Sequence, residues 1–236
     1  MHYFKKCTSY NFLIRSVEKP EEYVFLLTHI GGWLNPDIKS IASLCRDNGI
    51  ALIEDCAHSC YIPGAGTKGD IAIWSFQAVK TLPIGDGGMI TTDDYELYKK
   101  LQSLAWFGIE STYSRVSGKN DTLKKISTKN PDGKPGYTWD YDVTELGYKY
   151  YMIDILAAIG LVQLKKLDKH LDIRRHIQKR YNDELSDVIQ PPEWSETVQY
   201  YCSRVPEDHR DALINYLKTK MIHTSVHFKP LHKYDI

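Results

Sequence analysis

Two short apolar runs, separated by a segment with helical periodicity, are the feature of this sequence that most restricts its fold. The runs Y-V-F-L-L-T (residues 23–28) and I-A-L-I (residues 50–53) are continuous and short, which is typical of buried strands. Between them, N-P-D at 35–37 is a helix-start signal, Gly49 is a stop signal, and apolar residues recur at helical spacing: Ile38, Ile41, Ala42 and Cys45. A strand–helix–strand unit joins parallel strands, so we predict an α/β fold whose parallel sheet is covered on both faces.

Similar patterns predict further elements in the first half of the chain. Apolar runs indicate strands at residues 71–76 and 89–92, and a helix is expected over 95–103. A polar stretch rich in glycine and proline follows at 108–141. It is longer than most loops inside compact domains, which favours a functional or mobile segment.

The second half of the chain predicts helices and then a small α+β unit. A helix over 152–169 is apolar on several sides, so we expect it to be buried on several sides. A charged and more exposed helix is predicted near 173–185. The tail then indicates a strand, a helix and a strand at 198–205, 207–220 and 224–228. We therefore predict a large domain over 1–165 and a small domain over 166–236.

Composition excludes some classes of function. The 236 residues carry 30 Lys plus Arg and 30 Asp plus Glu, a net charge of zero, whereas a dedicated nucleic-acid binder needs a basic surplus. No apolar run approaches the ~20 residues that a membrane span requires. Five cysteines without a C-x-x-C pair, and a first segment without an apolar secretion signal, favour a reduced, cytoplasmic protein.

Four polar residues lie close to the predicted strand ends. Asp55 follows the run I-A-L-I, and an acid at the carboxyl end of such a strand is well placed for a ligand. Lys80 follows the next strand among apolar neighbours, where desolvation favours the neutral, nucleophilic amine that Schiff-base formation requires. Ser75 can donate a hydrogen bond to a phosphate, and His58 can approach a ring.

Each of these residues also has an ordinary structural explanation. Asp55 can be a helix cap, Lys80 a solvated surface lysine, and the serine and histidine can bond only to backbone. Taken together, however, an acid at one strand end and a lysine after another match the needs of pyridoxal phosphate. The lysine binds the aldehyde, and the carboxylate keeps the pyridine nitrogen protonated so that the ring accepts electrons.

The strings I-A-L-I-E-D-C-A-H-S and G-D-I-A-I-W-S-F-Q-A-V-K-T-L-P-I-G-D-G-G-M-I-T-T resemble the DegT/DnrJ/EryC1/StrS family of sugar aminotransferases. The likeness continues through E-L-G-Y-K-Y-Y-M-I-D-I-L-A-A-I-G-L-V-Q-L-K-K-L-D to H-T-S-V-H-F-K-P-L-H and covers roughly residues 24–234. The resemblance implies the fold type I of pyridoxal 5'-phosphate enzymes. It also implies transfer of an amino group, with glutamate as the expected donor, to a nucleotide-linked keto-sugar, and a homodimer with sites at the interface.

The resemblance also assigns roles to particular residues. Lys80 falls on the catalytic Schiff-base lysine, where related dehydratases carry histidine, so transamination is favoured. Asp55 falls on the acid that pairs with the pyridine nitrogen, His58 beside the cofactor ring, and Ser75 on the phosphate ligand. Lys149 stands where the family often has an asparagine that reaches the phosphate of the neighbouring subunit. Tyr151 replaces a frequent arginine, which leaves its contact undefined.

The last motif of the likeness places His227 near the sugar-nucleotide site. We expect no metal, and a site formed by His223, His227 and His232 is the alternative.

Relatives in this family carry further segments before and after the matching region, including the turn that grips the cofactor phosphate. We therefore expect an N- and C-terminally incomplete member with a partial large domain, a mostly parallel sheet and a partial small α+β domain. Missing strands would expose apolar faces, so weak cofactor affinity and poor solubility are expected. The alternative is a non-catalytic remnant or one half of a split aminotransferase.

Overall fold

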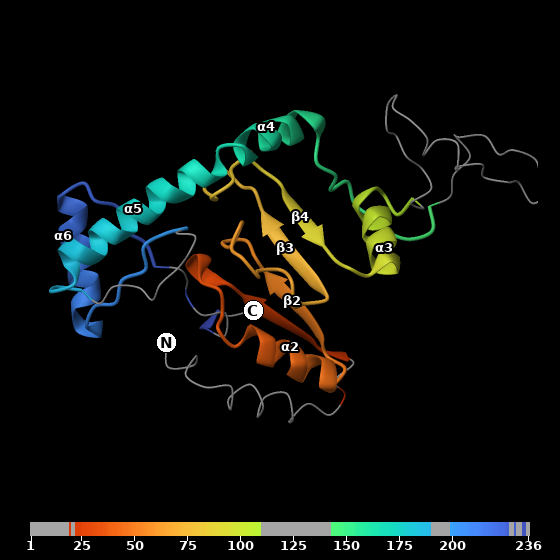
Figure 1. The fold of residues 1–236 in the computed structure, drawn as a ribbon, viewed down its shortest axis with the longest axis horizontal. Coiled ribbons are helices and arrows are strands. Elements are labelled where there is room, and N and C mark those ends of the chain that lie inside the picture. Colours follow the sequence, from red (N-terminus) through yellow and green to blue (C-terminus); the bar gives the residue numbers. More distant parts are fainter. Residues whose placement is uncertain are drawn as a thin grey trace, which may run out of the picture.

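The computed structural model describes residues 19, 22–109, 143–189, 199–226, 229 and 233–234. A four-stranded sheet in the order β1-β2-β3-β4 lies at its centre (Figure 1). Its strands lie close to the predicted runs: β1 (Val24–Thr28), β2 (Ala51–Asp55), β3 (Ile71–Ser75) and β4 (Gly88–Thr91).

The sheet is mostly parallel, as the sequence predicts. β1, β2 and β3 run parallel, whereas β4 is antiparallel to β3. The connection from β1 to β2 contains a helix, as parallel crossovers usually do, whereas the connection 56–70 from β2 to β3 contains none but is long enough for a crossover. The chain reverses direction in the loop 76–87 between β3 and β4, and β4 pairs with β3 in the opposite direction.

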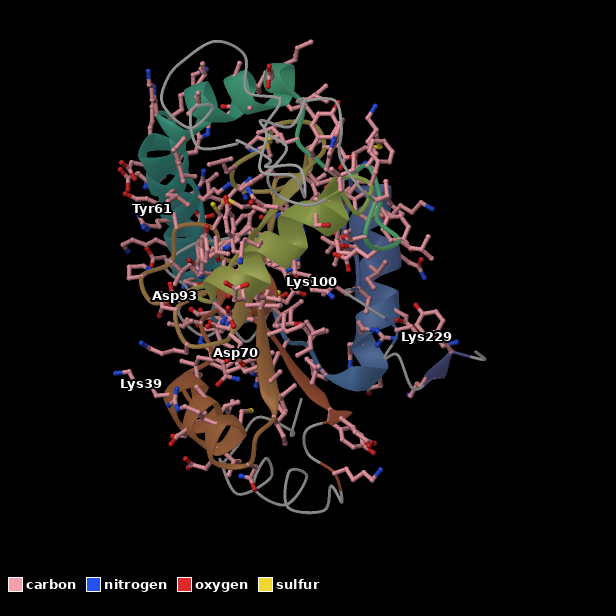
Figure 2. The ribbon with its side chains drawn as sticks, turned by 90° about the vertical axis from the view of Figure 1, so that its right-hand side faces the viewer. Lys39, Tyr61, Asp70, Asp93, Lys100 and Lys229 are labelled. Carbon is pink, nitrogen blue, oxygen red and sulfur yellow. The ribbon has the colours of Figure 1, made fainter. Side chains whose placement is uncertain are left out.

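Helix α2 (Ile38–Asp47) connects β1 to β2 and covers one face of the sheet. All four apolar residues of the predicted helical stripe are buried, and they pack against strand residues such as Leu27 and Leu52. Gly49 ends this segment with a φ of +67°, a conformation that glycine adopts without steric cost. In Figure 2, Lys39 projects from α2 away from the strands, and Tyr61 lies on the same side of the molecule.

The opposite face of the sheet is apolar and poorly covered. Alternate residues of β1 point to this face, and Val24 and Leu26 are 59% and 58% exposed. Ile73 of β3 and Ile90 of β4, which pair in register, are also exposed. For the described residues, the prediction of a sheet covered on both faces is therefore wrong. No described helix takes on this face the role that α2 has on the other.

Helix α3 (Tyr95–Ala105) confirms the helix predicted after β4. The Asp94 carboxylate caps it by accepting hydrogen bonds from the backbone N–H of Glu96 (2.8 Å) and of Leu97 (3.1 Å). The polar stretch predicted at 108–141 lies outside the described residues from position 110 onwards.

The apolar helix predicted over 152–169 is divided. α4 (Asp154–Leu164) ends before Lys165, and α5 (Leu167–Leu185) continues through the charged segment that was predicted as a separate helix. No residue of α4 is buried, and Ile155 and Leu161 are 71% and 66% exposed, so the expected burial on several sides is wrong for the described structure. α5 does reach the core, where two of its leucines join three residues of the loop 76–87: Leu167, Leu171, Phe76, Leu82 and Ile84.

The tail contains a helix but no strand among residues 199–226. The short turn η4 (Glu207–His209) leads into α6 (Arg210–Thr219), which confirms the predicted helix. Figure 1 shows α5 running from α4 towards α6. In the described part of the chain, no helix has the length and apolar character needed to cross a bilayer.

Candidate functional site

Asp55 and Ser75 are the last residues of two neighbouring strands, β2 and β3. The register pairs Asp55 with Ile73, two residues before Ser75. Because side chains alternate along a strand, Asp55, Ile73 and Ser75 emerge on the same face of the sheet. This is the face that α2 leaves open, and both polar side chains are half-buried there.

The Asp55 carboxylate is held by hydrogen bonds from neutral donors. Thr28 Oγ1, from the paired position of β1, donates to Oδ2 at 3.3 Å, and the backbone N–H of Ala57 donates to Oδ1 at 3.0 Å. Within the described ranges no lysine or arginine forms an ion pair with Asp55. The carboxylate is therefore oriented by neutral donors and can still accept a charged one.

Lys80 lies in the loop that leaves the end of β3. Its backbone N–H donates to the carbonyl of Gln77 at 2.9 Å, and the N–H of Ala78 donates to the carbonyl of Gly85 at 2.8 Å. Phe76, before Lys80, and Leu82 and Ile84, after it, are buried against α5, so the loop is anchored on both sides of Lys80. The lysine itself is half-buried, five residues beyond Ser75.

His58 lies in the turn after β2, three residues beyond Asp55. The backbone N–H of Gly31 donates to its Nδ1 at 3.2 Å. Tyr200 Oη lies 3.3 Å from the same nitrogen, and the two rings meet edge to face with centroids 5.1 Å apart. The structure thus brings a residue of the C-terminal part against this histidine.

Lys149 is not brought to this strand end. It is exposed, it forms an isolated antiparallel bridge with Trp106 just after α3, and its amine lies 5.6 Å from the ring centroid of Tyr151. His227 and His232 lie outside the described residues, and His223 is exposed. The proposed roles of these residues therefore remain predictions.

Glu54 is the polar residue that the sequence analysis did not single out. It is fully buried on the α2 side of the sheet. Its carboxylate accepts hydrogen bonds from the backbone N–H of Lys68 (2.6 Å), Gly69 (2.7 Å) and Gly66 (2.9 Å), and His29 Nε2 lies 2.9 Å away. The period of two along I-A-L-I-E-D could have indicated it, because that period places Glu54 and Asp55 on opposite faces.

His29, Glu54 and Cys56 are all buried, with potential ligand atoms within 4.8 Å of one another. They nevertheless do not suit a metal. The Glu54 oxygens already receive the donors named above, and His29 Nδ1 accepts from the backbone N–H of Asn35 at 3.3 Å. Burial, with the nearby Glu54 and Asp55 carboxylates, raises the pKa of Cys56 to about 12, so its thiol stays protonated and cannot act as a thiolate ligand. The cluster fixes the end of β2 and the loop 66–69.

Comparison with known proteins places these features in a family. Residues 12–236 match the profile of the DegT/DnrJ/EryC1/StrS aminotransferase family. A curated relative from Saccharopolyspora spinosa, dTDP-4-dehydro-2,3,6-trideoxy-D-glucose 4-aminotransferase, is 34% identical over 229 residues. That alignment covers 92% of this chain and 55% of the relative.

Solved structures show the same fold. The aminotransferase TlmJ from Streptoalloteichus hindustanus superposes with a TM-score of 0.73 at 31% identity, over 89% of this chain and 53% of TlmJ. Spr1654 from Streptococcus pneumoniae, solved in its PMP form, gives a TM-score of 0.75 at 27% identity, over 96% of this chain and 60% of Spr1654. The predicted α/β fold, as part of the fold of these aminotransferases, is confirmed. The chain spans about half the length of the proteins that it matches.

Proposed function

The chain belongs to the DegT/DnrJ/EryC1/StrS aminotransferase family, and from that premise we propose that it serves in pyridoxal-phosphate-dependent transfer of an amino group to a nucleotide-linked keto-sugar. The observation that carries the proposal is the shared, open face on which Asp55 and Ser75 end neighbouring strands, with the Lys80 loop leaving the second strand. The named activity of the Saccharopolyspora relative supports a nucleotide-sugar substrate. The neighbour solved in its PMP form supports the cofactor.

The chemistry of the donor set fits pyridoxal 5'-phosphate. When bound, this cofactor supplies an electron-accepting ring that makes the α-proton of an amino acid removable. Asp55, oriented by Thr28 and Ala57, would keep a proton on the ring nitrogen, and Ser75 would donate a hydrogen bond to the phosphate. His58 would lie beside the ring.

We assign Lys80 two tasks. Its amine would hold the cofactor through the aldehyde carbon, and once released it would carry the α-proton of the amino donor, which we propose is glutamate. Proton transfer by a positioned side chain typically contributes ~10²–10⁴-fold to the rate. The anchored loop around Lys80 limits the positions that the amine can reach, as such a task requires.

Finer parts of the proposal rest on the family likeness. Lys149 would reach the cofactor phosphate of a neighbouring subunit, and its exposure on the described surface is compatible with that role. His227 would lie near the sugar nucleotide. We propose that residues 1–165 contribute to the cofactor domain and 166–236 to the small domain. We place the protein in the cytoplasm as a homodimer, and free buried thiols such as Cys45 suit a reducing compartment.

Visible absorption with added pyridoxal phosphate, before and after borohydride, tests the proposal. Wild type should show a cofactor band that borohydride fixes covalently, and Lys80→Ala should lose it. Lys39→Ala is the matched control, because Lys39 projects outward from α2 (Figure 2) and should leave the band unchanged. If wild type and Lys80→Ala give the same spectra, the assignment of Lys80 is wrong.

One observation favours a second candidate function, in which the chain acts by association as one half of a two-chain enzyme. The exposed apolar face that carries Val24 and Leu26 also carries Asp55 and Ser75 at its end. In this case the chain alone would give no cofactor band, and adding the part of the Saccharopolyspora enzyme that lies outside the alignment would restore it. If neither sample gives the band, the chain is a non-catalytic remnant.

A further inference from the structure

A segment from the C-terminal part of the chain returns to the candidate site. The backbone N–H of Gln199 donates to the carbonyl of Gly31 at 3.3 Å, and its side-chain Nε2 donates to the carbonyl of Val79 at 2.7 Å. Val79 immediately precedes Lys80. One residue therefore ties the loop after β1 to the loop that carries the lysine.

Tyr200 adds a contact to the turn after β2. Its hydroxyl oxygen lies 3.3 Å from Nδ1 of His58, and its ring packs edge to face on the imidazole with centroids 5.1 Å apart. Burial, with Cys202 nearby, raises the pKa of Tyr200 to about 12, so the hydroxyl keeps its proton and can donate it. The packing of the Tyr200 ring thus restricts the orientation of the imidazole, and its hydroxyl contacts Nδ1.

The hydrogen bonds determine which nitrogen of His58 carries a proton. A backbone N–H can only donate, and Gly31 donates to Nδ1 at 3.2 Å. Nδ1 must therefore be an acceptor, which leaves the proton of the neutral ring on Nε2. The proton of the neutral ring is therefore on the nitrogen that Gly31 does not contact.

We propose that Tyr200 is a positioning residue for His58, which together with the Gly31 backbone holds the imidazole as the Nε2–H tautomer so that it presents a donor to a bound ligand. A ligand that carries an acceptor oxygen on a planar ring can accept a hydrogen bond from this Nε2–H group. Only the identity of that ligand as pyridoxal phosphate rests on the proposed function. The contact between Tyr200 and His58 spans 142 positions of the chain and joins the C-terminal part to the site.

Histidine side-chain ¹H–¹⁵N correlation spectra of the full chain test the tautomer without any cofactor. Loss of a signal in His58→Asn assigns the residue. Wild type should show the Nε2–H pattern, and Tyr200→Phe, which keeps the ring and removes one donor, should reduce the share of that tautomer. Tyr201→Phe is the matched control, because the Tyr201 hydroxyl donates to Asn182 Oδ1 at 3.0 Å instead. An Nδ1–H pattern in wild type, or identical His58 signals in the two tyrosine variants, overturns the proposal.

A double-mutant cycle that measures the dissociation constant of pyridoxal phosphate tests whether Tyr200 acts on cofactor binding through His58. Tyr200→Phe should weaken binding about three- to tenfold, the range expected for loss of one hydrogen bond. In the His58→Ala background the same change should have no further effect. Equal effects in both backgrounds would overturn the positioning role, because Tyr200 would then act independently of His58. If wild type shows no Lys80-dependent cofactor band, the proposed function fails, and the tautomer spectra still decide this inference.

Discussion

Glu54 and Asp55 are consecutive in β2, yet their carboxylates lie on opposite faces of the sheet and in different environments. Glu54 is fully buried and held by three backbone N–H groups and His29. Asp55 is half-buried and held by Thr28 and Ala57 at the open face. The Glu54 carboxylate fixes the end of β2 from the α2 side, and Asp55 is thereby held at the open face, where we propose that it meets the cofactor.

Glu54→Gln should destabilise the protein without removing its fold. An amide has only one acceptor oxygen, so at least one of the buried N–H donors from Gly66, Lys68 or Gly69 loses its partner. We expect a loss of roughly 2–3 kcal/mol in the free energy of unfolding, measured by urea denaturation with far-ultraviolet circular dichroism. Glu96→Gln is the control, because the Glu96 carboxylate forms an exposed surface pair with Lys99. Equal losses in the two variants would mean that the buried network is not stabilising.

The same carboxylate predicts a pH dependence. Burial alone would raise the pKa of Glu54, but hydrogen bonds from His29 and from the N–H groups of Gly69, Lys68 and Gly66 outweigh it and hold the pKa below its ordinary value. A lowered folded-state pKa contributes stability above the unfolded value of about 4.3, and this contribution is lost as the pH falls through the folded-state value.

Wild type should therefore be more stable than Glu54→Gln at neutral pH, and the difference should shrink below about pH 4. Urea unfolding of both proteins across this range measures it. The difference between the two free energies of unfolding is used because other carboxylates also titrate in this range, and their contributions are the same in both proteins. A difference that stays constant with pH would show that Glu54 does not titrate as its contacts require.

The local parts of the fold were predictable from the sequence. Continuous apolar runs located β1, β2 and β3, and the helical spacing of Ile38, Ile41, Ala42 and Cys45 located α2 and its buried side. The strand ends then placed Asp55 and Ser75, because parallel strands present their carboxyl ends at one edge. The apolar neighbours of Lys80 indicated a nucleophilic amine, and the family likeness added its assignment as the Schiff-base lysine.

Long-range features were not predictable. The direction of β4 depends on its pairing with β3, and the apolar run at 89–92 contains no information about that. α4 was expected to be buried because its sequence is apolar, yet burial depends on what packs against it. The contact between Tyr200 and His58 spans 142 positions, and no motif marks it.

Two glycines have nearly the same backbone conformation but different surroundings. Substituting each by alanine therefore distinguishes the cost of backbone strain from the cost of steric crowding around the new Cβ. Gly66 and Gly49 have φ values of +69° and +67°. A Cβ at Gly66 would lie 2.4 Å from Trp74 Cζ2 and 2.9 Å from the Cβ of Ala72, whereas nothing lies within 4 Å of a Cβ at Gly49.

Gly49→Ala should therefore cost about 1–2 kcal/mol, the strain of a left-handed residue. Gly66→Ala should cost a further 1–3 kcal/mol or so, because Trp74 must move in a packed region and the loop that supplies donors to Glu54 shifts with it. Urea unfolding of the two variants measures the difference. If both variants lose the same free energy, the loop 66–69 is free to move and does not hold Glu54.

We expect the exposed helix α4 to be the contact surface of the proposed homodimer. Leu161 is 66% exposed on a helix that has no buried residue, and burying such a side chain contributes roughly 1.5–3 kcal/mol. In a two-fold symmetric dimer each substitution acts twice, so Leu161→Asp should convert a dimer into a monomer. Sedimentation velocity measures the mass of each species. Val188→Asp is the control, because Val188 is 71% exposed beyond the end of α5 and should leave the dimer intact. A wild-type chain that sediments as a monomer, or a Leu161→Asp variant that remains dimeric, would show that α4 is not the contact surface.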